Sequence, residues 1–179
     1  LRIDEAGRVR FRWQDREVAV PFGGRAHVRN ALLALALGLE WGVDPDEAVA
    51  ALEALKPPKM RGEVHRYGEL TVIADCYNSN PASLAAAVDT LVHMPRGGGR
   101  VVVIGSMLEM GPRSAALHQS SARAIADADV DLVVGTGLFV EALEPFRARL
   151  GDRLVLAEDV EAAFEPMAAR MSGDEIVLL

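Results

Sequence analysis

The sequence predicts an α/β fold with a Rossmann-like, doubly wound, mainly parallel sheet. Apolar strand segments alternate with helical segments from residue 70 onward, as expected of a parallel sheet with right-handed crossovers. Residues 101–104 are apolar at every position, which is typical of a strand covered on both faces. The pattern before residue 57 is different, so we expect a separate structural unit there.

The bulk properties indicate a soluble globular protein. The 179 residues are 50% apolar and 25% charged, enough for one domain and part of another. The net charge of −7 argues against nucleic acid and against an anionic membrane as partners. A single cysteine, Cys76, fits a reducing cytoplasm, and no apolar run reaches the ~20 residues of a membrane span. The chain begins with Leu1 and stops within a strand pattern, so we expect a fragment.

The first 57 residues predict short strands followed by helices. Residues 9–13 and 17–20 alternate between polar and apolar side chains, as half-buried strands do. Residues 30–39 are apolar on nearly every face and rich in helix formers, which predicts a buried helix. Asp44 precedes Pro45 and is expected to cap the next helix.

A Lys-Pro-Pro-Lys run at residues 56–59 ends that helix and marks the domain boundary. We therefore assign residues 1–57 to one domain and residues 58–179 to the next, which is truncated at its end. The expected strands are residues 70–74, 101–104, 132–134, 154–156 and 175–179, and the expected helices are residues 81–92, 114–128, 138–150 and 160–171. Ligands of such sheets bind beyond the carboxyl ends of the strands.

The loop at residues 75–81, Asp-Cys-Tyr-Asn-Ser-Asn-Pro, is the strongest candidate site. The carboxylate of Asp75 can accept two hydrogen bonds from a ribose diol, and the amide of Asn78 can both donate and accept. Asn80 has an equally good explanation as the cap of the following helix. The loop at residues 105–112, whose only charge is Glu109, and the glycine turn at residues 135–137 give weaker signals.

The histidines, the cysteine and the absence of one motif argue against a metal site, a cysteine nucleophile and independent triphosphate binding. No histidine pairs with another or with Cys76 at metal-ligand spacing, so we expect no metal site. We expect His65 and His93 to face solvent, whereas His118 follows the Glu109 loop and can face the same cleft. Cys76 is expected to pack rather than to act as a nucleophile. The sequence contains no Walker A pattern, so the chain alone is not expected to bind a triphosphate in the usual way.

Four motifs resemble, in content and in order, those of the Mur ligase family. They are residues 24–32 (Gly-Arg-Ala-His-Val-Arg-Asn-Ala-Leu), 60–63 (Met-Arg-Gly-Glu), 74–81 (Ala-Asp-Cys-Tyr-Asn-Ser-Asn-Pro) and 105–111 (Gly-Ser-Met-Leu-Glu-Met-Gly), with His118 behind the last. The resemblance runs from about Gly24 to Leu179. The sequence departs from the family pattern at Ala26, His27, Ala74 and Ser106, where the family has His, Asn, Asp and Asp.

The resemblance implies a position in a three-domain enzyme. The chain would be the tail of the central ATP-binding domain followed by most of the Rossmann-like third domain. The implied ATP-binding residues are Asn30 near the adenine, Arg61 at the phosphates, Asp75 at the ribose, and Tyr77, Asn78 and Asn80 in the same loop. Arg61 is also the implied catalytic residue, and Glu109 and His118 would lie toward the substrate. The resemblance implies Mg²⁺ as well, held mainly by the rest of the enzyme.

The resemblance also implies a reaction. ATP would phosphorylate the carboxylate of UDP-MurNAc-tripeptide, and the amine of D-alanyl-D-alanine would attack the acyl phosphate, in peptidoglycan precursor synthesis in the bacterial cytoplasm. The partners would be these substrates and the N-terminal and central domains of the same polypeptide, and the fragment alone is expected to be inactive. The alternatives are a sister ligase or folylpolyglutamate synthase that adds a single amino acid, and a non-catalytic nucleotide-binding α/β module.

Overall fold

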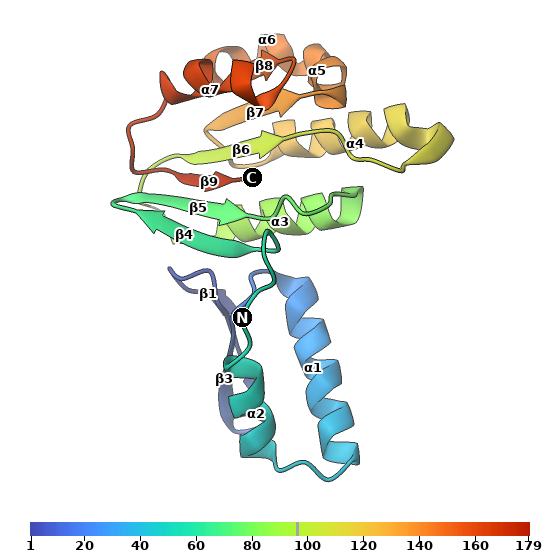
Figure 1. Cartoon of the computed structure of the whole chain (residues 1–179), viewed down its shortest axis with the longest axis vertical. Coiled ribbons are helices and arrows are strands. Elements are labelled where there is room, and N and C mark those ends of the chain that lie inside the picture. The colour runs from blue at the N-terminus through green and yellow to red at the C-terminus, as the bar shows by residue number, and fades with distance from the viewer. Residues whose placement is uncertain (96) are drawn as a thin grey trace.

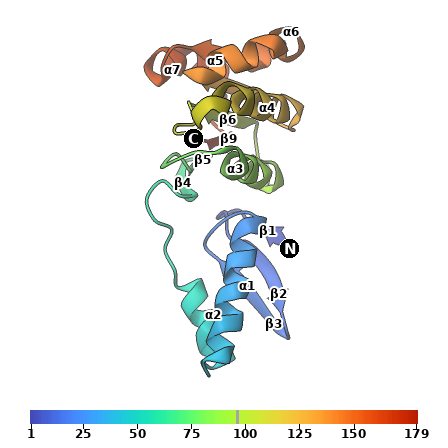
Figure 2. The same ribbon diagram turned by 90° about the vertical axis from the view of Figure 1, so that its right-hand side faces the viewer.

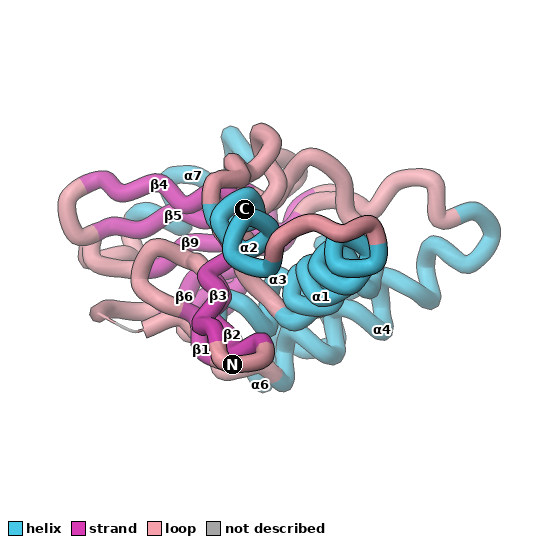
Figure 3. The backbone as a smooth tube through the Cα atoms, turned by 90° about the horizontal axis from the view of Figure 1, so that it is seen from below, coloured by secondary structure: helices cyan, strands magenta, loops and turns pink. Residues whose placement is uncertain are grey.

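The computed structural model describes residues 1–95 and 97–179, without the side chains of Arg25 and Ala26. The molecule is elongated, with a smaller N-terminal unit stacked below a larger C-terminal unit (Figure 1). The N-terminal unit comprises β1 (Arg2–Ile3), β2 (Val9–Trp13), β3 (Arg16–Val20), α1 (Arg25–Glu40) and α2 (Pro45–Glu53). Its strands form an antiparallel sheet in the order β1-β2-β3, and both helices lie beside it (Figure 3).

The N-terminal elements follow the sequence pattern, with one difference in α1. Val9 and Phe11 of β2 are buried and alternate with more exposed arginines, as predicted. Asp44 caps α2, since its side chain accepts hydrogen bonds from the backbone amides of Asp46 and Glu47. The prediction of a buried helix at residues 30–39 is wrong. The small sheet and α2 cover only one face of α1, so the opposite apolar face is exposed.

The C-terminal unit is the predicted mainly parallel sheet, with strands in the order β4-β5-β9-β6-β7-β8. Its strands are β4 (Glu63–Tyr67), β5 (Leu70–Ala74), β6 (Arg100–Ile104), β7 (Leu132–Thr136), β8 (Leu154–Ala157) and β9 (Ile176–Leu178). β4 pairs antiparallel with β5, whereas the remaining pairs are parallel. The sequence pattern did not predict β4, because neither of its faces is buried and its side chains show no apolar alternation.

Helices cover both faces of this sheet, as the doubly wound prediction requires. The helices are α3 (Pro81–His93), α4 (Ser114–Asp127), α5 (Leu138–Leu143), α6 (Arg147–Leu150) and α7 (Val160–Ala168), with 3₁₀ turns η1 (Gly111–Arg113), η2 (Glu144–Phe146) and η3 (Gly151–Arg153). Val102 of β6 joins the core under α3, α4 and α5, whereas its neighbour Val101 joins the core under α7. The single helix predicted at residues 138–150 is broken at Pro145, which lacks a backbone donor.

The two units meet at a tight seam. Figure 2 shows an extended linker from α2 to β4 on one side of the molecule. On the seam itself, Gly23 approaches α3 so closely that an added Cβ would lie 2.4 Å from Cγ2 of Thr90. A guanidinium nitrogen of Arg66 donates to the carbonyl oxygen of Glu5 at 2.6 Å. Within the described residues, no helix has the length and apolar character needed to cross a membrane.

Candidate functional site

The Asp75 loop leaves the carboxyl end of β5 and lies against the end of the linker. The Gly62 amide donates to the Ala74 carbonyl oxygen at 2.9 Å, and the Tyr77 amide donates to the Met60 carbonyl oxygen at 3.1 Å. Met60 and Gly62 both have positive φ, which makes a sharp turn around Arg61. These bonds hold the backbone of residues 60–62 beside the loop, so Arg61 and Asp75 belong to one structural group.

Arg61 and Asp75 define the electrostatics of this group. The carbon atom of the Arg61 guanidinium lies 4.2 Å from the centroid of the Tyr77 ring, a cation–π contact. Partial burial raises the pKa of Asp75, while the Gly62 amide and the Arg61 charge act in the opposite direction. The carboxylate is therefore short of solvent, and a ligand that donates hydrogen bonds to it would offset part of the cost of its burial.

A cavity of about 260 Å³ lies in the seam between the two units. Gly23 and His27 line it from the N-terminal unit, and Arg61, Asp75, Tyr77 and Asn78 line it from the C-terminal unit. The structure thus brings together four of the residues proposed to bind ATP, and we call this cavity the seam cleft. It joins a cation, a carboxylate, an amide and an aromatic ring, groups suited to the phosphate, ribose and base of a nucleotide.

His27 contributes a feature of the seam cleft that the sequence did not predict. Its ring stacks on Phe22, with centroids 5.1 Å apart and an interplanar angle of 24°. His27 keeps an exposed surface, but partial burial in the cleft lowers its pKa, which favours the neutral ring. Asn30, the predicted adenine neighbour, is exposed one turn farther along α1 and is not among the residues that line the cleft.

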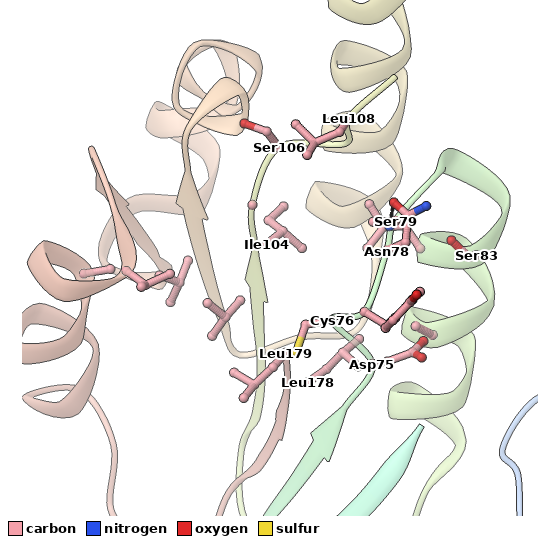
Figure 4. Close-up of a pocket in the computed structure, with 18 of the residues that line it drawn as sticks. Asp75, Cys76, Asn78, Ser79, Ser83, Ile104, Ser106, Leu108, Leu178 and Leu179 are labelled. Carbon is pink, nitrogen blue, oxygen red and sulfur yellow. Dashed lines mark hydrogen bonds between the residues drawn. The ribbon is translucent and has the colours of Figure 1, made fainter. Parts of the chain in front are cut away.

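A larger cavity of about 560 Å³ lies beyond the carboxyl ends of β5, β9, β6 and β7. Figure 4 shows Asn78 and Ser79 on the side of α3, and Ser106 and Leu108 beyond the end of β6. Most of its remaining lining is apolar, including Phe164 of α7. Asp75 lines both cavities, so its loop is the wall they share.

The remaining predicted site residues lie outside the seam cleft. Asn80 caps α3, since its Oδ1 accepts from the amides of Ala82 and Ser83 at 3.0 Å each, which confirms the cap interpretation. Glu109 is exposed and has a φ of 61°. His118 is only 1% exposed, behind the loop that carries Glu109.

The expected packing of Cys76 is wrong, because Cys76 is exposed and lines the larger cavity. His65 and His93 are exposed, as expected. The side chain of Ala26 lies outside the described residues.

Oγ of Ser106 accepts from the Leu138 amide at 2.9 Å, so this side chain helps to begin α5. Among the described residues, no group of three or more His, Cys, Asp or Glu side chains is arranged to hold a metal ion. The described side chains therefore include polar groups suited to a nucleotide but no cluster of metal ligands.

Comparisons with known proteins find relatives that match most of this chain. UDP-N-acetylmuramoyl-tripeptide–D-alanyl-D-alanine ligase of Treponema pallidum is 32% identical over 182 residues, covering 99% of this chain and 39% of the relative. MurF of Acinetobacter baumannii superposes with a TM-score of 0.77 at 28% identity, covering 91% of this chain and 36% of that one. MurF of Thermotoga maritima, solved with ADP, has a TM-score of 0.76 at 21% identity, covering 96% and 39%, and shows the shared fold.

The chain therefore spans well under half the length of these relatives. The match to a family extends over residues 60–179, which correspond to the family described as Mur ligase, glutamate ligase domain. This match covers the linker turn at Arg61, the Asp75 loop and the whole parallel sheet. The chain belongs to the Mur ligase family.

Proposed function

We propose that this chain is part of an ATP-dependent ligase that joins D-alanyl-D-alanine to UDP-MurNAc-tripeptide through an acyl phosphate. The observation that carries the proposal is the seam cleft, where Arg61, Asp75 and Tyr77 meet at the boundary of two units. The printed name of the Treponema pallidum relative supports the choice of substrates. The polar groups of the cleft support the use of a nucleotide.

The side chains of the seam cleft each have a task in this reaction. Asp75 accepts hydrogen bonds from the two ribose hydroxyls, which donate to a carboxylate already short of solvent. Arg61 leaves the face of Tyr77 and reaches the phosphates, where its planar donors stabilise the moving phosphoryl group. Because an acyl phosphate hydrolyses in water, closure of the C-terminal unit over the site protects it.

The exposed face of α1 supports the presence of further domains. Leu33, Leu37 and Trp41 are 63%, 54% and 80% exposed and follow one another at helical spacing. An apolar stripe of this size is costly in water and is typical of a surface that another domain covers. In our proposal the rest of the polypeptide packs here and holds most of the ATP phosphates and Mg²⁺.

The first test is ATP-dependent amide formation by the polypeptide of the complete reading frame, with D-alanyl-D-alanine or single amino acids as acceptors. We expect the dipeptide to be preferred, whereas preference for a single amino acid would indicate a sister ligase instead. Arg61→Ala should lower kcat by about a hundredfold or more, because one donor to the transition state is lost. Arg12→Ala, on the exposed side of β2, is the matched control and should leave the rate unchanged.

The second test uses the 179-residue chain alone. We expect it to form no amide in the presence of ATP and both substrates, because the sequence has no Walker A pattern. Calorimetry with ATP tests the remaining alternative, in which the chain is a separate protein that binds a nucleotide without catalysis. Tight nucleotide binding by this chain, together with an independent start codon directly before it, would favour a non-catalytic nucleotide-binding module.

A further inference from the structure

His118 is a buried polar group to which the proposed mechanism gives no role. It lies on the second turn of α4, 1% exposed, with its ring edge against Phe139 at a centroid distance of 5.0 Å. Such a histidine is usually part of a hydrogen-bond network, because an unpaired ring nitrogen in the core is costly. The partners of its two nitrogens therefore decide what the ring does.

Both nitrogens have backbone partners that select one tautomer. Nδ1 lies 2.8 Å from the carbonyl oxygen of Ser114, which only accepts, so Nδ1 carries the hydrogen and donates. Nε2 is then unprotonated and accepts from the Met107 amide at 2.9 Å. The first bond stays within α4, whereas the second joins α4 to the loop between β6 and η1.

This second bond connects α4 to the loop at residues 105–110, which is strained and borders a cavity. Met107 is 1% exposed and anchors the loop, while its neighbours Ser106 and Leu108 line the larger cavity. Glu109, two residues farther on, has a φ of 61°, a conformation that a residue with a side chain adopts only when its surroundings impose it. The bond from Met107 to His118 is thus placed to fix the path of the chain into Glu109.

We propose that His118 is a positioning residue, whose neutral ring holds the 105–110 loop in place through the Met107 amide. Nε2, the nitrogen able to take a proton, is already occupied by that amide, and the ring has almost no exposed surface. His118 therefore acts through the loop and not by proton transfer to a substrate. This inference rests on the proposed function, to which it adds that the loop, as part of the lining of the larger cavity, borders the site of the amine acceptor.

Three substitutions separate the roles that a buried histidine can have. Gln reaches far enough to place its side-chain oxygen near the position of Nε2 and can accept from Met107. Asn reaches only the position of Nδ1 and can bond only within α4. Leu fills the space with no hydrogen bond. If His118 transfers a proton, all three variants should lose activity. If it only fills space, Leu should preserve its function. If it positions the loop, only Gln should preserve its function.

The first measurement is amide hydrogen exchange of Met107 in the 179-residue chain, followed by NMR. We expect about tenfold faster exchange in His118→Asn and His118→Leu and nearly unchanged exchange in His118→Gln, since one hydrogen bond is lost or kept. Nitrogen chemical shifts of the ring should show hydrogen on Nδ1 alone. Unchanged Met107 exchange in the Leu variant, or hydrogen on Nε2, would overturn the proposal.

The second measurement is steady-state kinetics of the complete polypeptide. We expect KM for the acceptor to rise about tenfold in the Asn and Leu variants with a smaller change in kcat, and to recover in the Gln variant. Equal loss of kcat in all three variants would show proton transfer and overturn the inference. If the unsubstituted polypeptide has no ligase activity, the proposed function fails, and hydrogen exchange alone decides whether His118 holds the loop.

Discussion

At the scale of single residues, Asp75 combines a binding task with a cost in stability. Burial raises its pKa above the ordinary value of 3.8, so the folded protein holds that proton more tightly than the unfolded chain. The unfolding free energy therefore falls as pH rises from that value through the folded pKa. At neutral pH the charged carboxylate destabilises the fold, a cost that nucleotide binding offsets in our proposal.

We predict that Asp75→Asn stabilises the 179-residue chain at pH 7 and that this gain disappears near pH 3, where Asp75 is protonated in both states. Urea unfolding at both pH values measures the change. In the complete polypeptide, the same substitution should weaken nucleotide binding about tenfold or more, since a charged acceptor is lost. A variant that is less stable at pH 7 than the original chain would contradict the prediction.

Asp46 is the matched control for this pH effect. It is exposed, and its hydrogen bond from Arg16 lowers its pKa, so its contribution has the opposite sign. Asp46→Asn should lower stability at pH 7, and that loss should fade as pH falls through the folded pKa of Asp46. Opposite slopes for the two variants would show that the gain at Asp75 comes from burial and not from the loss of any carboxylate.

Substitutions of Asn80 distinguish its role as a helix cap from a role in ligand binding. Its Oδ1 accepts from two amides in the first turn of α3, so Asn80→Ala should cost about 1 kcal/mol of unfolding free energy. Asn80→Asp keeps the acceptor and should restore stability by the same urea measurement. If Asn80→Asp also leaves nucleotide affinity unchanged in the complete polypeptide, the amide nitrogen has no part in binding.

The positions of some site residues were predictable from the sequence, whereas others were not. Asp75 directly follows the expected strand at residues 70–74 and Asn78 comes three residues later, so their place at the carboxyl edge of the sheet was predictable from the chain alone. His27 was not, because it reaches the seam cleft only through the close approach of the start of α1 to α3. The bonds from Met60 and Gly62 to the loop are also tertiary and leave no mark in the sequence pattern.

At the scale of elements, α1 shows the limit of reading burial from composition. Its apolar residues surround the helix, yet the described residues bury only the face that carries Val28, Ala31 and Leu35. The sequence therefore predicted the helix but not the face that other elements cover. In the C-terminal unit, by contrast, continuous apolar runs such as residues 101–104 predicted strands with helices on both sides.

Two leucines of α1 test this difference. Leu35 is 1% exposed, so Leu35→Ala should lower the unfolding free energy of the 179-residue chain by about 2–5 kcal/mol. Leu33 is 63% exposed, and Leu33→Ala should change it by less than about 0.5 kcal/mol. In the complete polypeptide the Leu33 substitution should cost several times more, if another domain covers this face. Equal effects in both proteins would argue against such a domain.

At the scale of the whole molecule, the seam between the units depends on glycine. Gly23 lies where any side chain would meet α3, and its Cβ would come within 2.4 Å of Cγ2 of Thr90. The seam cleft lies directly beside this contact, because Gly23 and Thr90 are also among its lining residues. The absence of a side chain at residue 23 thus sets how closely the two units approach across the proposed nucleotide site.

We predict that Gly23→Ala lowers the unfolding free energy by about 1–3 kcal/mol, because the contact with Thr90 is already close. Thr90→Ala removes the methyl group that clashes, so the double variant should be more stable than the sum of the single effects predicts. Urea unfolding of the four proteins measures this coupling.

Gly38→Ala is the control for the general effect of adding a methyl group. An added Cβ there meets only the side chain of Val43 at 3.7 Å, and alanine favours the helix. We expect this variant to be slightly more stable than the original chain. Simple additivity of Gly23→Ala and Thr90→Ala would show that the seam adjusts without strain.

The position of β9 has a consequence for how the protein is made. β5 and β6 do not pair with each other, and β9 lies between them, with Leu178 opposite both Ile73 and Val102. The two halves of the sheet therefore cannot join until residues 176–178 have left the ribosome. Pairings that span so many residues form slowly, and until then each half presents an open strand edge to other chains. Newly synthesised molecules should thus depend on chaperones most strongly in the interval before β9 inserts.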